Sequence, residues 1–279
     1  MTELRYKFTY DTLFKLLFVK YPDLLKRLVA AILGISADAI SEFRITNPEI
    51  PPEAIGDKFC KLDINMVVNN RLANLEVQVE DEGDYPERSL YYWARIYSSV
   101  LKAGKPYSSL PRVIIISIVD FIMFDCAEYR SEFLPLEVHR HELLSDRMAM
   151  LYFEVRKLPK EIDIKNELEL MLSLFRVKTE EELKQLEALE VAIVTQAIGA
   201  YREVVVSPEF HELERLRADA RHNEASALLH AQRKAENAER EKWQNIVADK
   251  DAALADKEAA LAEKDAEIAQ LRAQLEKQK

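Results

Sequence analysis

The stretch KLDINMVVNNRLANLEVQVE, residues 61–80, contains two short apolar runs interrupted by polar residues at every second position. Side chains alternate between the two faces of a strand, so this pattern predicts two strands. The asparagines between them suit left-handed backbone conformations and predict a hairpin turn at Asn69-Asn70-Arg71. One face of this hairpin then carries five polar side chains: Asp63, Asn65, Glu76, Gln78 and Glu80.

This polar face has two interpretations. An antiparallel sheet with one face in water shows the same alternation without any active site. Alternatively, the carboxylates and the amide gather there because they carry chemistry. The pattern alone favours the first interpretation, so the decision depends on the rest of the chain.

Helical patterns flank the hairpin on both sides. Apolar residues at helical spacing predict helix in residues 10–33, with a break at Pro22 and a stop at Gly34. A second helix is expected from Asp84 or Tyr85 to Gly104. Its expected buried stripe consists of Leu90, Trp93, Ala94, Tyr97 and Leu101.

Two further strands complete the predicted core. Residues 112–121 are apolar on both faces, which is typical of a strand in the centre of a sheet. Residues 150–158 are aromatic and β-branched enough for one more strand. The order helix, strand, strand, helix, strand, strand indicates an α/β fold, a mixed sheet flanked by helices, within residues 1–160.

From Glu161 onward the sequence looks helical, with Pro208 between two helical stretches. We expect a helical subdomain at 161–208 and a long helix or coiled-coil tail at 209–279. Leu254, Leu261, Ile268 and Leu275 recur at intervals of seven, but charged residues occupy the second position of the seam. The pattern therefore predicts either a weak coiled coil, most plausibly a homodimer, or a long solvated helix.

Composition narrows the classes of protein. The formal net charge of −10 does not indicate a nucleic-acid binder, yet an enzyme that holds a divalent cation also collects carboxylates. No apolar run is long enough to span a membrane, and the first eleven residues do not resemble a secretory signal. Two isolated cysteines do not form a disulfide framework. We expect a cytoplasmic protein without a membrane partner.

Other catalytic motifs are missing from the sequence. There is no G-x-S-x-G elbow and no Walker A loop. His139 and His141 have a spacing that can bind a metal ion, but a solvated surface is the simpler interpretation. Elimination leaves the carboxylates of the hairpin.

Four motifs in order resemble one known family. Asp63 followed by Glu76-Val77-Gln78 is similar to the D-x(n)-(D/E)-x-K core of PD-(D/E)XK nucleases, with glutamine in place of lysine. D-x-x-F-K occurs at Asp11 to Lys15, R-x-x-x-Y at Arg88 to Tyr92, and G-x-x-Y at Gly104 to Tyr107 before an apolar strand. Together they resemble the recombination-promoting nuclease and putative transposase family over residues 8–125.

The resemblance implies a restriction-endonuclease-like core in residues 1–160 and a catalytic polar face. It implies a hard cation, Mg²⁺ or alternatively Mn²⁺, bound by the Asp63 and Glu76 carboxylates and the Val77 carbonyl. Gln78 orients water through its amide but carries no positive charge. Asp11, Lys15 and Arg88 are brought near the site, where Lys15 or Arg88 can supply the missing charge. Taken without the resemblance, Asp11 and Lys15 form an ordinary surface ion pair.

The expected function is Mg²⁺-dependent DNA endonuclease activity, in a bacterial setting of recombination, mobile elements or defence. The alternative is a catalytically silent protein that keeps the nuclease fold and acts through DNA binding or through assembly by its coil.

Overall fold

The computed structural model describes residues 2–46, 49–50, 60–61, 63–101 and 104–277, and it divides into two compact units, Met1–Glu214 and Arg215–Lys279. Leu62, expected on the apolar face of the hairpin, lies outside the described residues. In the described part of the chain, no helix combines the length and the apolar character needed to cross a bilayer.

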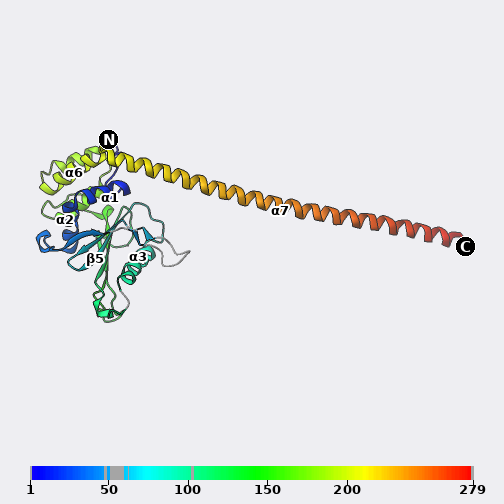
Figure 1. Cartoon of the computed structure of the whole chain (residues 1–279), viewed down its shortest axis with the longest axis horizontal. Coiled ribbons are helices and arrows are strands. Elements are labelled where there is room, and N and C mark those ends of the chain that lie inside the picture. The colour runs from blue at the N-terminus through cyan, green and yellow to red at the C-terminus, as the bar shows by residue number, and fades with distance from the viewer. Residues whose placement is uncertain (1, 47–48, 51–59, 62, 102–103, 278–279) are drawn as a thin grey trace. The chain divides into compact units, whose positions relative to one another are not determined.

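In the first unit two helices precede a run of strands, one helix separates this run from the last strands, and further helices follow them (Figure 1). The strands are β1 (Phe43–Thr46), β2 (Glu49–Ile50), β3 (Cys60–Lys61), β4 (Ile64–Val68), β5 (Arg71–Gln78), β6 (Val113–Val119), β7 (Arg130–Phe133) and β8 (Met148–Glu154). The α-helices are α1 (Asp11–Lys20), α2 (Pro22–Leu33), α3 (Tyr85–Val100), α4 (Glu167–Arg176), α5 (Glu180–Glu187), α6 (Ala192–Val205) and α7 (Pro208–Lys277). Single 3-10 turns lie at Ala37–Ala39, Tyr107–Ser109 and Val155–Lys157.

A six-stranded mixed sheet in the order β1-β4-β5-β6-β8-β7 forms the centre of the first unit. The predicted hairpin is β4 and β5, paired antiparallel, and its turn residues Asn69 and Asn70 have φ angles of 48° and 61°. β6 runs parallel to both β5 and β8. All seven residues of β6 are buried, which confirms the prediction of a central strand. The short edge strands β1 and β7 were not predicted, because four-residue segments of mixed polarity carry little periodic signal.

Helices cover the two faces of the sheet unequally. On one face, α1, α2, α4 and α6 pack against alternate residues of the strands, such as Leu75 and Ile116, and form the large core. On the other face, α3 packs over a smaller core that includes Ile115 and Tyr152. Figure 1 shows α1, α2 and α6 together on one side of β5 and α3 on the other.

The predicted buried stripe of α3 is wrong in part. Leu90 and Ala94 are exposed, while Tyr85, Ser89 and Ile96 are buried. The Tyr85 hydroxyl donates to Ser117 Oγ on β6 at 2.8 Å, and Ser89 bonds Tyr152 on β8. Paired buried hydroxyls thus select the inner face of the helix, a choice that apolar periodicity cannot reveal. The helix also ends at Val100, before the predicted stop at Gly104.

Residues 161–208 fold onto the large core, to which α4, α5 and α6 contribute buried side chains. The predicted capping box at the start of α5 is present, since Thr179 Oγ1 accepts from Glu182 N and Glu182 accepts from Thr179 N. Phe210, in the first turn of α7, is also part of this core. The division at 160 and 208 stays a prediction about which parts fold on their own.

Candidate functional site

Asp63 and Glu76 lie side by side where β4 begins and β5 ends. Asp63 precedes the first residue of β4, and Glu76 stands opposite it because Ile64 pairs with Leu75. Two hydrogen bonds join Asp63 to the end of β5. Asp63 N donates to Glu76 Oε1 at 2.9 Å, and Val77 N donates to Asp63 Oδ2 at 3.0 Å. The hairpin therefore brings both predicted carboxylates together and fixes the direction of each.

Glu76 is buried. Only 2% of its surface is exposed, and Asn74 on the same face is fully buried. Removal from water raises the pKa of Glu76 to about 8, and the neighbouring Asp63 carboxylate adds to this rise. At Asn74 and Glu76 this face is therefore not the wet side of a sheet, whereas Asp63, Asn65 and Gln78 are half-buried and Glu80 is exposed.

Lys15 reaches the pair from α1. Its Nζ lies 3.0 Å from Asp63 Oδ1 and 2.7 Å from Asp11 Oδ1. Burial alone lowers the pKa of Lys15, but the two carboxylates outweigh it and the pKa lies above its ordinary value. Burial likewise raises the pKa of Asp63, although the Lys15 cation opposes the rise. The Asp11–Lys15 pair is thus present, as expected for residues four apart, and it extends to the hairpin.

Gln78 and Arg88 meet on the far side of Glu76. Arg88 donates to Gln78 Oε1 at 2.8 Å and contacts Glu82 at 2.8 Å through its other terminal nitrogen. The guanidinium also lies over the Tyr85 ring, 5.0 Å from its centroid. These contacts hold Gln78 through its amide oxygen, so its amide nitrogen is the group directed elsewhere. Glu80 lies beyond the end of β5 and is exposed.

Sequence reasoning missed polar residues that support this site. Asn74 donates to Glu76 Oε1 at 2.9 Å and to Asn65 Oδ1 at 3.2 Å. Asn74, Glu76 and Gln78 alternate along one strand, so the same face argument that selected the last two also points to Asn74. At the ends of the neighbouring strands lie two more buried acids, Asp120 after β6 and Glu154 at the end of β8. An acid that directly follows an apolar strand is the sequence signal for them.

The predicted metal ligands have the right chemistry for a hard cation. Among the residues that the structure describes, no group of three or more His, Cys, Asp or Glu side chains is arranged to hold a metal ion. Two carboxylates are present, and Val77 supplies a third oxygen. The N–H and C=O groups of one strand residue point toward the same neighbouring strand. Because Val77 N donates to Asp63, the Val77 carbonyl also points toward the side on which Asp63 lies. Mg²⁺ commonly takes one or two carboxylates and completes its shell with water, so these residues fit it.

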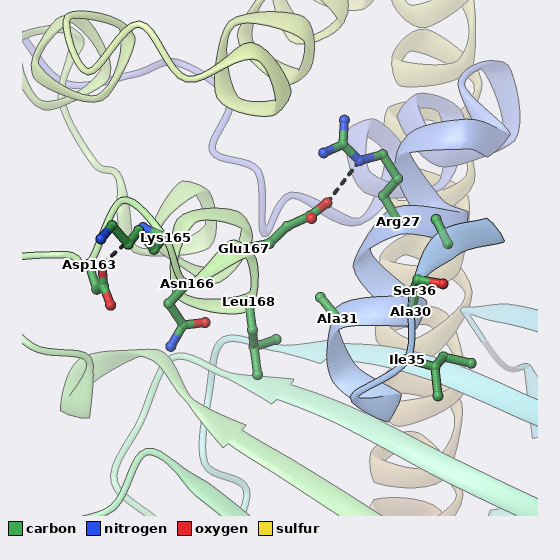
Figure 2. A pocket seen from close by; sticks show the side chains of 11 residues that line it. Arg27, Ala30, Ala31, Ile35, Ser36, Asp163, Lys165, Asn166, Glu167 and Leu168 are labelled. Carbon is green, nitrogen blue, oxygen red and sulfur yellow. Dashed lines mark hydrogen bonds and ion pairs between the residues drawn. The ribbon is translucent and has the colours of Figure 1, made fainter. Parts of the chain in front are cut away.

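Two other places in the described structure, the histidine pair with metal-binding spacing and a pocket between two helices, lack such a set of metal ligands. His139 and His141 are exposed, in line with a solvated surface. A pocket of about 510 Å³ lies between α2 and α4, as Figure 2 shows. Its Arg27 is paired with Glu167 at 2.8 Å, and its Asn166 caps α4 by accepting from Glu169 N. The polar groups that line this pocket are thus engaged in holding the two helices.

Comparison with known proteins identifies the family. No curated protein and no solved structure gives a match to this chain. The family model of the PD-(D/E)XK nuclease family transposases matches residues 8–232. The match reaches further than the motifs in residues 8–125, because it includes α4, α5, α6 and the first part of α7. With a mixed sheet, paired acids at the hairpin and a family match over most of its length, the chain belongs to the PD-(D/E)XK nuclease family transposases.

Proposed function

We propose that this chain is a Mg²⁺-dependent DNA endonuclease whose active site is built on Asp63, Glu76 and Gln78. The observation that carries the proposal is the buried pair of carboxylates, Asp63 and Glu76, with the Lys15 ammonium beside them. Buried like charges are costly unless a cation or a proton joins them. Mn²⁺ can replace Mg²⁺ at such an oxygen site.

Each residue has a distinct role in this proposal. Asp63, Glu76 and the Val77 carbonyl would hold the cation, which would supply positive charge for the scissile phosphate and lower the pKa of water at the site. Lys15, anchored by Asp11 and Asp63, supplies the positive charge that the motif lysine supplies elsewhere in the superfamily. Gln78 orients water with its amide N–H, and Arg88 positions Gln78 through the amide oxygen.

A cleavage assay with plasmid DNA tests the proposal. Wild-type protein is incubated with Mg²⁺, with Mn²⁺ and with EDTA. We expect nicked or linear product with either metal and none with EDTA. Intact plasmid in all three conditions, from protein with a normal melting transition, contradicts the proposal.

One observation favours the alternative of a silent nuclease fold. The Lys15 ammonium, with Nζ 3.0 Å from Asp63 Oδ1, already neutralises the Asp63 carboxylate. The described side chains form no cluster of three acidic, His or Cys ligands. Such a protein binds DNA or assembles without cutting. DNA binding that persists without any metal-dependent product identifies this alternative in the same assay. The bacterial setting of recombination, mobile elements or defence remains part of the proposal.

We also propose that α7 forms a homodimer through its apolar stripe. Val247, Leu254, Leu261 and Ile268 are all exposed along this helix at intervals of seven residues. Pairing through this stripe would bring two copies of the active site into one assembly, which suits cuts on both strands of a duplex. Phe210, at the start of α7, packs into the core, and the family match extends to residue 232. A truncation that tests the tail must therefore spare the start of α7 and end after Gln232.

Light scattering tests this assembly. Leu254→Lys with Leu261→Lys should convert dimer to monomer, because four buried charges oppose pairing. Ala252→Lys with Ala259→Lys is the matched control, with the same charge on the same helix. A dimer in both variants, or a wild-type monomer, contradicts pairing through the leucine stripe.

A further inference from the structure

Asp120 lies next to Gln78 at the end of β6. Asp120 N donates to Gln78 O at 2.8 Å, so the two residues are adjacent on neighbouring strands. Because Gln78 pairs with Val119, Asp120 is level with Val79, three residues beyond Glu76 and one strand across, so strand spacing places the Cα atoms of Asp120 and Glu76 about 11 Å apart. The Asp120 side chain is buried, with 5% of the residue exposed.

Two cations flank the Asp120 carboxylate. Arg156 Nε lies 3.0 Å from Oδ1, and Lys178 Nζ lies 3.5 Å from Oδ2. Both basic side chains remain accessible, since 49% of Arg156 and 44% of Lys178 is exposed. Taken by themselves, these three side chains sum to a formal charge of about +1, two cations against one carboxylate.

The backbone under each cation is fixed. Arg156 belongs to the 3-10 turn Val155–Lys157 directly after β8. Lys178 lies between α4 and α5, where Leu4 N donates to its carbonyl at 2.9 Å and its own N–H donates to Glu182 at 2.7 Å. Both side chains therefore start from fixed backbone positions, and the ion pairs with Asp120 orient their charged groups.

We propose that Arg156 and Lys178 bind backbone phosphates of the DNA strand beside the cleavage site, with Asp120 as the residue that positions them. This inference rests on the proposed function. A buried acid that serves stability alone needs only enough positive charge to compensate it, whereas here two half-exposed cations exceed that need. Arg156 uses Nε for Asp120, so its terminal NH₂ groups are the donors suited to a phosphate. A chain with a formal net charge of −10 needs such a local basic strip to hold DNA.

DNA binding by fluorescence anisotropy tests the inference. The probe is a short labelled duplex in EDTA, so that no cleavage intervenes. The test variant is Arg156→Gln with Lys178→Gln. The matched control is Lys105→Gln with Arg140→Gln, an equal charge change at exposed positions before β6 and before β8, the opposite end of these strands.

The test variant should weaken binding roughly tenfold and lower the slope of log affinity against log salt by about 1.8, for two phosphate contacts. The control should stay within about twofold because its charges lie away from the site. Lys178→Arg should retain wild-type affinity, since it keeps the charge. If the test variant melts at a lower temperature, the comparison is repeated with Asp120→Asn added to both variants, which removes the uncompensated buried charge.

Equal affinities and equal salt slopes in the test and control variants overturn the inference while the proposed function stands. A wild-type chain that neither binds the duplex nor cuts plasmid with Mg²⁺ contradicts the proposed function, and the inference with it. Cleavage by wild type together with a selective loss of binding in the test variant supports both.

Discussion

Glu76 and Glu154 are buried on the same face of the sheet, at the ends of the two strands that flank β6, yet their surroundings differ in charge. Glu154 accepts hydrogen bonds from Met123 N at 2.6 Å and Phe124 N at 3.3 Å, and Lys157 Nζ lies 2.8 Å from its other oxygen. Glu76 accepts from Asn74 and from Asp63 N, and it faces a second carboxylate. Glu154 is compensated by a cation, whereas Glu76 is not.

This difference separates a structural acid from a candidate functional one. A buried charge with a cation and two backbone donors secures the segment after β6. A buried charge beside a like charge is a local cost to stability, which folds keep where function requires it. The contrast predicts opposite responses to the loss of each carboxylate.

Glu154→Ala should give the largest loss of stability. Removing it leaves two backbone N–H groups without their acceptor and the Lys157 ammonium, which still donates to Phe124 O, without its counter-charge, and this costs about 3–5 kcal/mol. Urea denaturation measures this loss. Glu154→Gln with Lys157→Met is the control, since it removes both charges and should cost less. Wild-type stability in Glu154→Ala contradicts the structural role.

Glu76→Gln should change the pH dependence of stability in metal-free protein. The pKa of Glu76 is about 8 in the folded chain against an ordinary value of 4.5, so the folded state holds one more proton between these values. Stability therefore falls as pH rises from about 4.5 to 8, by a magnitude on the order of 5 kcal/mol. Glu76→Gln removes this contribution. Melts in EDTA across this range measure the difference, and parallel curves for the two proteins contradict the raised pKa.

Lys15→Met should slow cleavage by about 10- to 100-fold, because the phosphate loses a positive charge in the transition state. Lys20→Met is the control on the same helix, since Lys20 pairs with Glu203 at 2.8 Å and not with the hairpin. Initial rates of plasmid cleavage distinguish the two variants. Equal rates in both leave Lys15 as a structural ion-pair partner of Asp63.

Gln78→Ala should have the smallest effect, about tenfold or less in rate, because an amide orients water without carrying charge. Gln78→Lys should retain activity, since it restores the residue found in the wider superfamily motif. Rate measurements at saturating Mg²⁺ test both variants. A complete loss of cleavage in Gln78→Ala shows a larger role than orientation.

The hairpin and the central strand could be predicted because their signals are local. Alternation along 61–80 and two asparagines located β4, β5 and their turn, and an apolar run located β6. The inner face of α3 could not be predicted, because it depends on hydroxyl pairs with β6 and β8 that are distant in sequence. The edge strands β1 and β7 were also not predicted, because their pairing partners define them and their own periodicity does not.

From local patterns alone the candidate site was predictable only where side chains share one element or one hairpin, and the resemblance to the family added Lys15 and Arg88. Asp63 and Glu76 follow from register, and Lys15 from its helical spacing to Asp11. The contact between Lys15 and Asp63 requires the packing of α1 beside the hairpin, which no local pattern specifies. The contacts of Asp120 with Arg156 and Lys178 also depend on tertiary packing. They require the end of β6, the turn after β8 and the segment between α4 and α5 to come together.

The central claim is that Asp63 and Glu76 form a catalytic metal site and not a structural pair. The most direct measurement is the rate of Mg²⁺-dependent plasmid cleavage by Asp63→Asn and Glu76→Gln, with a thermal melt of each variant in EDTA. We predict that each substitution lowers the rate by at least about 100-fold, since the loss of residues that only support metal ligands already costs about 10- to 100-fold. We also predict that Glu76→Gln melts at or above the wild-type temperature at pH 8. Variants that melt several degrees lower and still cut at the wild-type rate contradict the claim.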